Sequence, residues 1–216
     1  MQAISDIRCF GRWMTVAFPE DYGCASWAIV NGGLSVSRMI AWRFLEIDEI
    51  ERVPDVAKWF RNELAAEGMK HAVGLLTSRQ LHRYVESGEG TGCHVVATVG
   101  LSNALAVGDP VFPGGIGTIN ILCALDQRLS NEASLEALAL AAEARTSAML
   151  ELQVPSVVSR RPATGTGTDC IVIASPRRGV PEEYCGKHTE WGHRIGMHVR
   201  EAVRRGAEEW LAETRA

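Results

Sequence analysis

Hydroxyl and carboxylate side chains crowd one short glycine-rich segment, Ala163-Thr164-Gly165-Thr166-Gly167-Thr168-Asp169. Its glycines let backbone N–H groups approach a ligand, and its hydroxyls and carboxylate supply polar groups for binding or proton transfer. In dinucleotide-binding and P-loop motifs the glycines open a helix, whereas this segment leads into an apolar strand, so nucleotide phosphate is disfavoured. The alternative is an ordinary turn whose threonines satisfy their own backbone.

A second glycine-rich loop, Gly114-Gly115-Ile116-Gly117-Thr118-Ile119-Asn120, also enters a strand and places a hydroxyl and an amide at its mouth. If the two strands are neighbours, we expect Thr118, Asn120, Thr168 and Asp169 to lie together at one sheet edge, in a cleft suited to a ligand. Such a pocket could activate water or a threonine, or simply hold a polar ligand. The glycines could instead serve tight turns, with Asn120 capping its own loop.

Two further candidates lie on predicted helices. Glu143 lies in an Ala/Leu-rich helix, where burying a carboxylate costs free energy unless the group is paired or takes part in binding or catalysis. The alternative is that Glu143 and Arg145 form the one solvated stripe of that helix. His188 lies where the last helix begins, and a helix N-terminus favours the neutral imidazole of a base or ligand, although a plain surface role is equally compatible. No H-E-x-x-H or C-x-x-C spacing occurs, so no metal site is predicted.

Periodicity and turn residues predict the elements that must hold these loops. Strands are expected at 13–18, 26–30, 38–45, 73–77, 93–101, 118–125 and 170–174, and helices at 55–67, 79–86, 132–152 and 188–213. The pattern predicts an α/β fold of mixed α+β layers in a single domain over residues 1–216. It has a strand-rich N-terminal third, a buried central helix and a long C-terminal amphipathic helix.

Composition narrows the class of protein. The chain has 216 residues, 46% of them hydrophobic, and a formal net charge of -4, which argues against nucleic acid as a partner. No uninterrupted apolar run of about 18 residues predicts a membrane span, and no basic segment followed by an apolar stretch opens the chain. The six cysteines lie in or beside apolar runs, which is typical of free, buried thiols and fits a cytoplasmic location.

Several motifs occur along the chain in a fixed order. They are Thr98-x-Gly100-x-x-Asn103, Gly117-Thr118-Ile119-Asn120, Glu143-Ala144-Arg145-Thr146, Ala163-Thr164-Gly165-Thr166-Gly167-Thr168-Asp169 and Gly186-x-His188-x-x-x-Gly192. This series resembles the adenosylcobinamide amidohydrolase family, CbiZ, closely over residues 72–205. Asn31-Gly32-Gly33 and Leu75-Leu76-Thr77 extend the resemblance more loosely toward the start, and Val99 departs from it where a small residue is expected.

The resemblance implies hydrolysis of the amide that joins the propionate side chain of the corrin ring to aminopropanol. The substrate would be adenosylcobinamide or a complete cobamide, and the product adenosylcobyric acid for cobamide salvage and remodelling. The corrinoid is then the substrate, so no cofactor is expected. The sequence leaves open whether the chain forms a homo-oligomer.

Amide hydrolysis needs an activated nucleophile, donors for the oxyanion and an acid for the leaving amine. We therefore predict that Asp169 or Glu143 activates water, that His188 acts as acid and base, and that Asn120 with loop N–H groups steadies the oxyanion. A competing mechanism uses a threonine of the 164–168 loop as a covalent nucleophile. The predicted catalytic residues are thus Asp169, His188, Glu143 and Thr168, and the predicted substrate-binding residues are Asn103, Thr118, Asn120, Thr164, Gly165, Thr166 and Gly167.

Two other classes of function stay open at this stage. A corrinoid-binding escort or sensor would use the same pocket without turnover. A phosphate-transferring enzyme would use the glycine and threonine loops as anion-binding nests.

Overall fold

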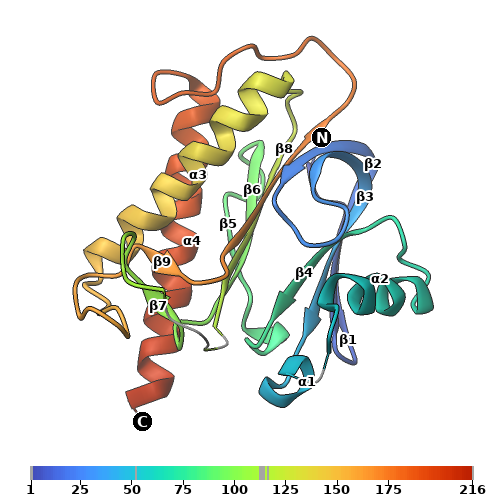
Figure 1. Ribbon diagram of the computed structural model, residues 1–216. Coiled ribbons are helices and arrows are strands. Elements are labelled where there is room, and N and C mark those ends of the chain that lie inside the picture. Colours follow the sequence, from blue (N-terminus) through green and yellow to red (C-terminus); the bar gives the residue numbers. More distant parts are fainter. Residues whose placement is uncertain (1, 52, 112–114, 116, 216) are drawn as a thin grey trace.

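One mixed sheet forms the centre of the computed structural model, which describes residues 2–51, 53–111, 115 and 117–215 (Figure 1). The strand order is β4-β3-β2-β10-β8-β6-β5, with β1 paired to β2, and a separate small sheet joins β7 to β9. The strands are β1 (Asp6–Phe10), β2 (Trp13–Ser26), β3 (Gly33–Phe44), β4 (Val73–Thr77), β5 (Val85–Ser87), β6 (Cys93–Val99), β7 (Ala104–Leu105), β8 (Ile119–Leu125), β9 (Gly165–Thr166) and β10 (Cys170–Pro176).

The helices divide between the two sides of this sheet. They are α1 (Ile47–Glu51), α2 (Val56–Ala66), α3 (Asn131–Glu151) and α4 (Glu190–Arg215), with a 3-10 turn at Leu81–Arg83. Figure 1 shows α3 and α4 side by side over one face, and α2 beside β4 on the other side. Side chains fix where two of them begin: Ser130 accepts from the N–H of Ala133 at 3.0 Å, and Asp55 from that of Lys58 at 2.9 Å.

Small residues let α3 pack closely on its neighbours. Ala133, Ala137, Ala141 and Ala148 are fully buried in the cluster that α3 and α4 share with the sheet. The burial of α3 is confined to this face, since Leu135 on its outer side is 55% exposed. In α4 the apolar face is fully buried at Ile195, Val199 and Ala202, with Trp191 and Trp210 partly buried at its edges.

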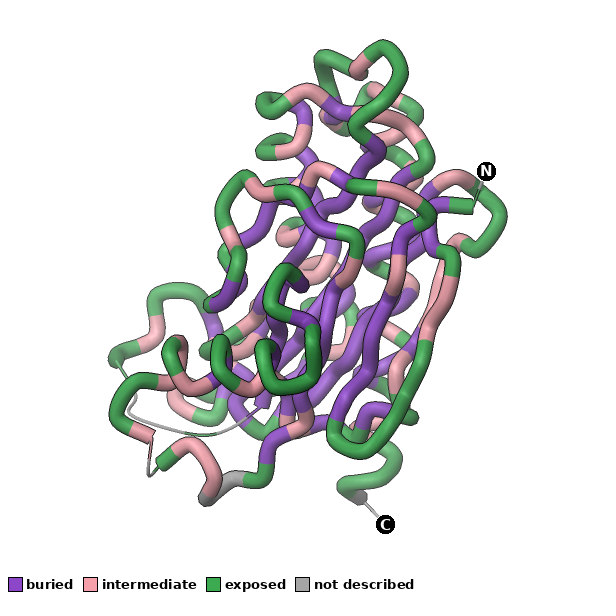
Figure 2. Tube along the Cα trace, turned by 90° about the vertical axis from the view of Figure 1, so that its right-hand side faces the viewer, coloured by how far each residue is buried: buried purple, intermediate pink, exposed green. Residues whose placement is uncertain are grey.

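Strand alternation divides the core into two faces. In β8, Ile121 and Cys123 pack toward α3 and α4, whereas Leu122 faces the opposite side. There Leu122 shares a cluster with Trp42 of β3 and Leu75 of β4, which we call the inner cluster. Three strands separate β4 from β8 in the sheet order, so their side chains meet only because the sheet curls around the inner cluster. Figure 2 shows this buried interior along the strands, with exposed residues on the loops and outer helix faces.

The structure confirms the predicted α/β class and most of the predicted elements. It also corrects several of them. β2 continues to Ser26 through an irregularity between Ala17 and Tyr22, so residues 27–30 form a connection and not a strand. The segment 79–86 is a 3-10 turn followed by β5, and β1, α1, β7 and β9 were not predicted. All six cysteines are free, and all are buried except Cys9, which lies exposed in β1 at the sheet edge.

No helix in the described part of the chain is long and apolar enough to cross a membrane.

The contact between α2 and β4 generates a stability prediction. A Cβ atom added at Gly74 would lie 2.6 Å from the buried ring of Phe60 and 3.0 Å from Leu64. We expect Gly74→Ala to lower the free energy of unfolding by about 1–3 kcal/mol because the packed ring cannot retreat. Gly196 lies inside α4 with nothing within 4 Å, so Gly196→Ala should raise the free energy of unfolding by up to about 1 kcal/mol. Urea unfolding of the two variants measures both changes. Equal changes in the free energy of unfolding for Gly74→Ala and Gly196→Ala would contradict this account.

Candidate functional site

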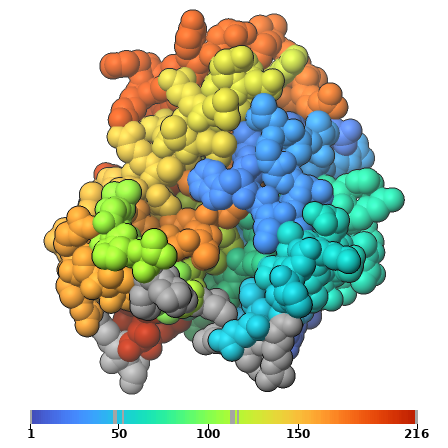
Figure 3. Space-filling view, in the orientation of Figure 1, coloured from blue at the N-terminus to red at the C-terminus, as the bar shows by residue number. Residues whose placement is uncertain are grey.

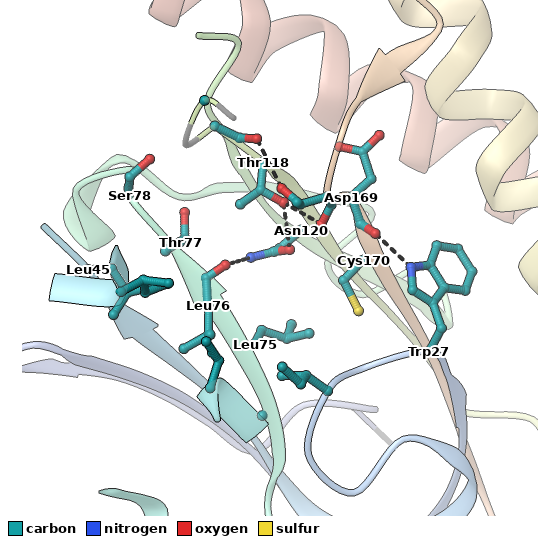
Figure 4. A pocket seen from close by; sticks show the side chains of 17 residues that line it. Trp27, Leu45, Leu75, Leu76, Thr77, Ser78, Thr118, Asn120, Asp169 and Cys170 are labelled. Atoms are coloured by element: carbon teal, nitrogen blue, oxygen red, sulfur yellow. Dashed lines mark hydrogen bonds between the residues drawn. The ribbon is translucent and has the colours of Figure 1, made fainter. Parts of the chain in front are cut away.

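A cavity of about 430 Å³ opens at one end of the curled sheet, between β4 and the starts of β8 and β10. We call it the β4–β8–β10 pocket. One wall is apolar and comes from Trp27, Ile29, Leu45, Ile50, Val56 and Leu75. The other wall is polar and comes from Thr77, Ser78, Thr118, Asn120, Thr168 and Asp169. In Figure 4 Thr118, Asn120 and Asp169 lie across the cavity from Leu45, with Trp27 beside Asp169, and Figure 3 shows the blue, cyan and orange parts of the chain meeting on this side of the molecule.

The two glycine-rich loops come together because β8 and β10 are parallel neighbours, with Asn120 opposite Cys170. The predicted adjacency of the loops is therefore confirmed. Thr118 donates to the carbonyl of Thr168 at 2.9 Å and lies 3.3 Å from Oδ1 of Asn120. The Asn120 amide crosses the curled interior and donates to the carbonyl of Leu76 in β4 at 2.7 Å. Positions 114 and 116 of the second loop lie outside the described residues.

The carboxylate of Asp169 is buried and fully engaged. Oδ1 accepts from the N–H of Ile119 at 3.0 Å and from the hydroxyl of Thr166. Oδ2 accepts from the N–H of Thr166 at 2.9 Å and forms an ion pair with Arg145 of α3. An ionised carboxylate has about four lone-pair sites, and four donors occupy them here. Asp169 thus ties its own loop to β8 and to α3, which fixes the polar wall of the pocket.

Close approach explains two of the glycines in this loop. A Cβ atom at Gly165 would lie 2.9 Å from Cζ of Arg145 and closer still to the carboxylate of Asp169. A Cβ atom at Gly167 would lie 2.6 Å from Nδ2 of Asn103. Neither glycine has a positive φ, so the lack of a side chain is what the loop requires at both positions.

Several predicted substrate-binding residues brace the pocket from behind and do not line it. The hydroxyl of Thr164 accepts from the N–H of Val107 at 2.9 Å, and that of Thr166 binds Asp169. Asn103 is 4% exposed, and its carbonyl accepts from the N–H of Gly167 at 3.2 Å. Its Oδ1 has no hydrogen-bond partner within the described ranges. For these residues the interpretation as turn-stabilising groups fits the geometry.

Glu143 and His188 are not brought to the pocket. Glu143 lies on the solvated side of α3, with its side chain 58% exposed and paired with Lys187. Arg145, expected on the same stripe, is instead turned inward against Asp169. His188 is exposed in the turn before α4, and Figure 1 shows that turn beyond the opposite end of the sheet from the start of β10. The geometry therefore separates both residues from Asp169 and Thr168.

Other pocket residues were not singled out from the sequence as a site. Trp27 is half exposed at the rim, and its indole N–H donates to the carbonyl of Asp169 at 2.6 Å. Ser78 follows β4, and its hydroxyl makes no hydrogen bond to any described group. Burial raises the pKa of Cys170 to about 11, so this thiol stays neutral and is a poor nucleophile near pH 7. Of these three residues, Ser78 adjoins the Leu75-Leu76-Thr77 segment of the resemblance and Cys170 follows Asp169, whereas Trp27 adjoins none of its segments.

Comparison with known proteins decides the family. The family model described as adenosylcobinamide amidohydrolase, CbiZ, matches residues 2–215. The chain belongs to the CbiZ family. It is 29% identical to an adenosylcobinamide amidohydrolase of Methanosarcina mazei over 165 residues, which cover 72% of this chain and 76% of that protein. It is 32% identical to a Halobacterium salinarum protein of the same name over 120 residues, covering 51% of this chain and 48% of that one.

An uncharacterized protein of Methanocaldococcus jannaschii is 37% identical over 91 residues, which cover 41% of this chain and 34% of that protein. The matched region thus spans only a third to a half of two of these three relatives.

The motifs on which the resemblance to CbiZ rests have distinct places in the structure. The Gly117–Asn120 and Thr164–Asp169 blocks form or brace the polar wall of the pocket. The 143–146 block supplies Arg145 and Thr146, whose hydroxyl donates to the carbonyl of Thr164 at 3.0 Å. The 186–192 block lies at the start of α4, where a Cβ at Gly192 would meet the carbonyl of Cys185 at 2.7 Å. Part of this motif series therefore supports the fold, away from the pocket.

The ion pair behind the pocket generates a second prediction. Arg145→Ala would leave the Asp169 carboxylate buried without its cation, so we expect the free energy of unfolding to fall by about 3–5 kcal/mol. The matched control is Lys187→Ala, because the Lys187–Glu143 pair is exposed and should contribute about 0–1 kcal/mol. Chemical denaturation of both variants measures the difference. A loss for Arg145→Ala no greater than that for Lys187→Ala would show that Asp169 does not depend on its partner.

Proposed function

We propose that this CbiZ protein hydrolyses the amide between the propionate side chain of the corrin ring and aminopropanol. Water adds to the carbonyl carbon, the C–N bond breaks, and the amine leaves with a proton. Adenosylcobinamide gives adenosylcobyric acid and aminopropanol, whereas from a complete cobamide the amine that leaves still carries the lower-ligand nucleotide. The substrate is adenosylcobinamide or a complete cobamide, for salvage and remodelling. We propose no cofactor or metal for this reaction.

The observation that carries this proposal is the two-sided pocket, whose polar wall comes largely from two of the motifs that resemble CbiZ. A cavity of about 430 Å³ falls in the range of small-molecule sites but is too small to enclose a corrin macrocycle with its side chains. We therefore place the aminopropanol arm inside, with its amide against the polar wall. The macrocycle then lies at the mouth, against the half-exposed apolar side chains of Trp27 and Ile29.

The geometry also supports specific roles. Asn120 uses one amide hydrogen on the carbonyl of Leu76, which leaves the second to donate to an oxyanion. Asp169 acts as a positioning residue, because its four donors leave no free lone pair for a proton from water. Among the loop threonines, only Thr168 lines the pocket, and its hydroxyl lies 3.2 Å from the carbonyl of Gly117. The covalent alternative therefore narrows to Thr168.

Incubation with adenosylcobinamide, without nucleotide or added metal, tests the function. We expect mass analysis to show adenosylcobyric acid and aminopropanol. A covalent adduct on Thr168 in the intact-protein mass spectrum would support the nucleophilic route. Bound but unchanged corrinoid, with adenosylcobinamide and with a complete cobamide, would contradict hydrolysis and support a non-catalytic escort or sensor.

Position relative to the pocket generates a third prediction. We expect Asn120→Ala to lower kcat by about a hundredfold or more, because it removes a donor to the oxyanion. Glu143→Gln and His188→Ala should retain kcat/KM close to the wild type, because both side chains lie outside the pocket. Steady-state kinetics on all three variants provides the measurement. A large loss in His188→Ala with an intact fold would place the chemistry elsewhere.

The rim generates a fourth prediction. Trp27→Ala should raise KM for the corrinoid by about tenfold while kcat changes less, since the side chain contacts the macrocycle and not the scissile amide. Trp27→Phe is the control: it keeps an aromatic face but loses the indole N–H bond to Asp169. It should lie near the wild type in KM. If the two variants show the same KM, the hydrogen bond to the Asp169 carbonyl, and not the apolar face, is what matters.

A further inference from the structure

The outer edge of β4 faces the pocket. β4 is the last strand of the sheet path, and among the described strands it pairs with β3 alone, apart from an isolated antiparallel bridge between Gly74 and Val30. The N–H of Leu45 donates to the carbonyl of Thr77 at 2.8 Å, so the backbone groups of Thr77 point toward β3. Because backbone groups alternate along a strand, those of Gly74 and Leu76 point the other way, into the unpaired edge.

Two side contacts cover part of this edge. The N–H of Gly74 donates to the carbonyl of Val30 at 3.0 Å, and the carbonyl of Leu76 accepts from Asn120 at 2.7 Å. Between them lies the N–H of Leu76, which donates to no group in the described part of the chain. An amide donor at the wall of a cavity is a group that a ligand carbonyl can satisfy.

The position of this donor matches the chemistry of the polar wall. Leu76 and Asn120 both line the pocket, and the Asn120 amide nitrogen is bonded to the carbonyl of the same residue, Leu76. The N–H of Leu76 and the amide group of Asn120 are therefore neighbours at the wall of the same cavity. Two fixed N–H donors in a largely apolar cavity are the arrangement that stabilises a tetrahedral oxyanion.

We infer that the backbone N–H of Leu76 donates to the scissile carbonyl of the substrate and, with Asn120, forms the oxyanion hole. The edge of β4 thereby becomes part of the catalytic site, where the substrate carbonyl takes the place of a neighbouring strand. This inference rests on the proposed amide hydrolysis and names the groups that bind its reacting carbonyl.

The experiment removes this one donor and keeps the strand. Proline lacks the N–H, and an edge strand accepts proline where the N–H points away from the ladder. We expect Leu76→Pro to lower kcat on adenosylcobinamide by about a hundredfold or more, with a much smaller change in KM. Leu76→Ala keeps the N–H and loses only the side chain, so it is the matched control: the loss of kcat in Leu76→Pro beyond that in Leu76→Ala measures the contribution of the N–H alone.

Thermal unfolding must show that both variants fold. If Leu76→Pro does not fold, Leu76 is replaced by its α-hydroxy acid, which exchanges only the N–H for an oxygen. We expect this variant to show the same loss of kcat. If the variant that lacks the N–H of residue 76 has the same kcat as Leu76→Ala, the inference is overturned. The proposed function still stands in that case, provided that the wild type is active. A wild type without turnover would instead refute the proposed function itself.

Discussion

The buried carboxylate of Asp169 is the interaction on which the rest of the site depends. It binds Ile119 at the start of β8, Thr166 in its own loop and Arg145 on α3, so one side chain joins three elements. Its own backbone carbonyl also receives the indole N–H of Trp27. Burying this charge is tolerable only because all its lone pairs are used, and the same contacts hold the pocket wall in place.

Curling of the sheet supplies the other half of the site. Strand alternation puts Asn120 on the same face as Leu122, and therefore on the concave side that holds the inner cluster. The curl then carries β4 across to meet β8, where Asn120 satisfies a carbonyl of the free β4 edge. A polar site thus forms where the apolar interior opens, and the neighbouring Leu75 and Leu45 exclude water from one side of it.

Local features of this chain were predictable, whereas long-range ones were not. The glycine and threonine loops entering β8 and β10 indicated a shared pocket, because parallel neighbouring strands start at the same end of a sheet. The pairing of Arg145 with Asp169 was missed, since helix periodicity cannot show which side chain of a short polar stretch turns inward. The contribution of β4 was missed as well, because it depends on how far the sheet curls. His188 was predicted to be catalytic because it lies at the start of a helix. The turn before α4 that carries it lies far from the loops that enter β8 and β10.

Hydrogen–deuterium exchange with and without adenosylcobinamide tests the central claim, that the corrinoid arm enters the β4–β8–β10 pocket. The account predicts slower exchange in residues 74–78, 117–120 and 168–170 when the corrinoid is bound, and little change in the surface groove between α3 and α4. That groove, of about 550 Å³, is lined by Glu143, Lys187 and His193. Protection confined to the groove, with the strand starts unchanged, would contradict the account and return Glu143 to consideration as a site residue.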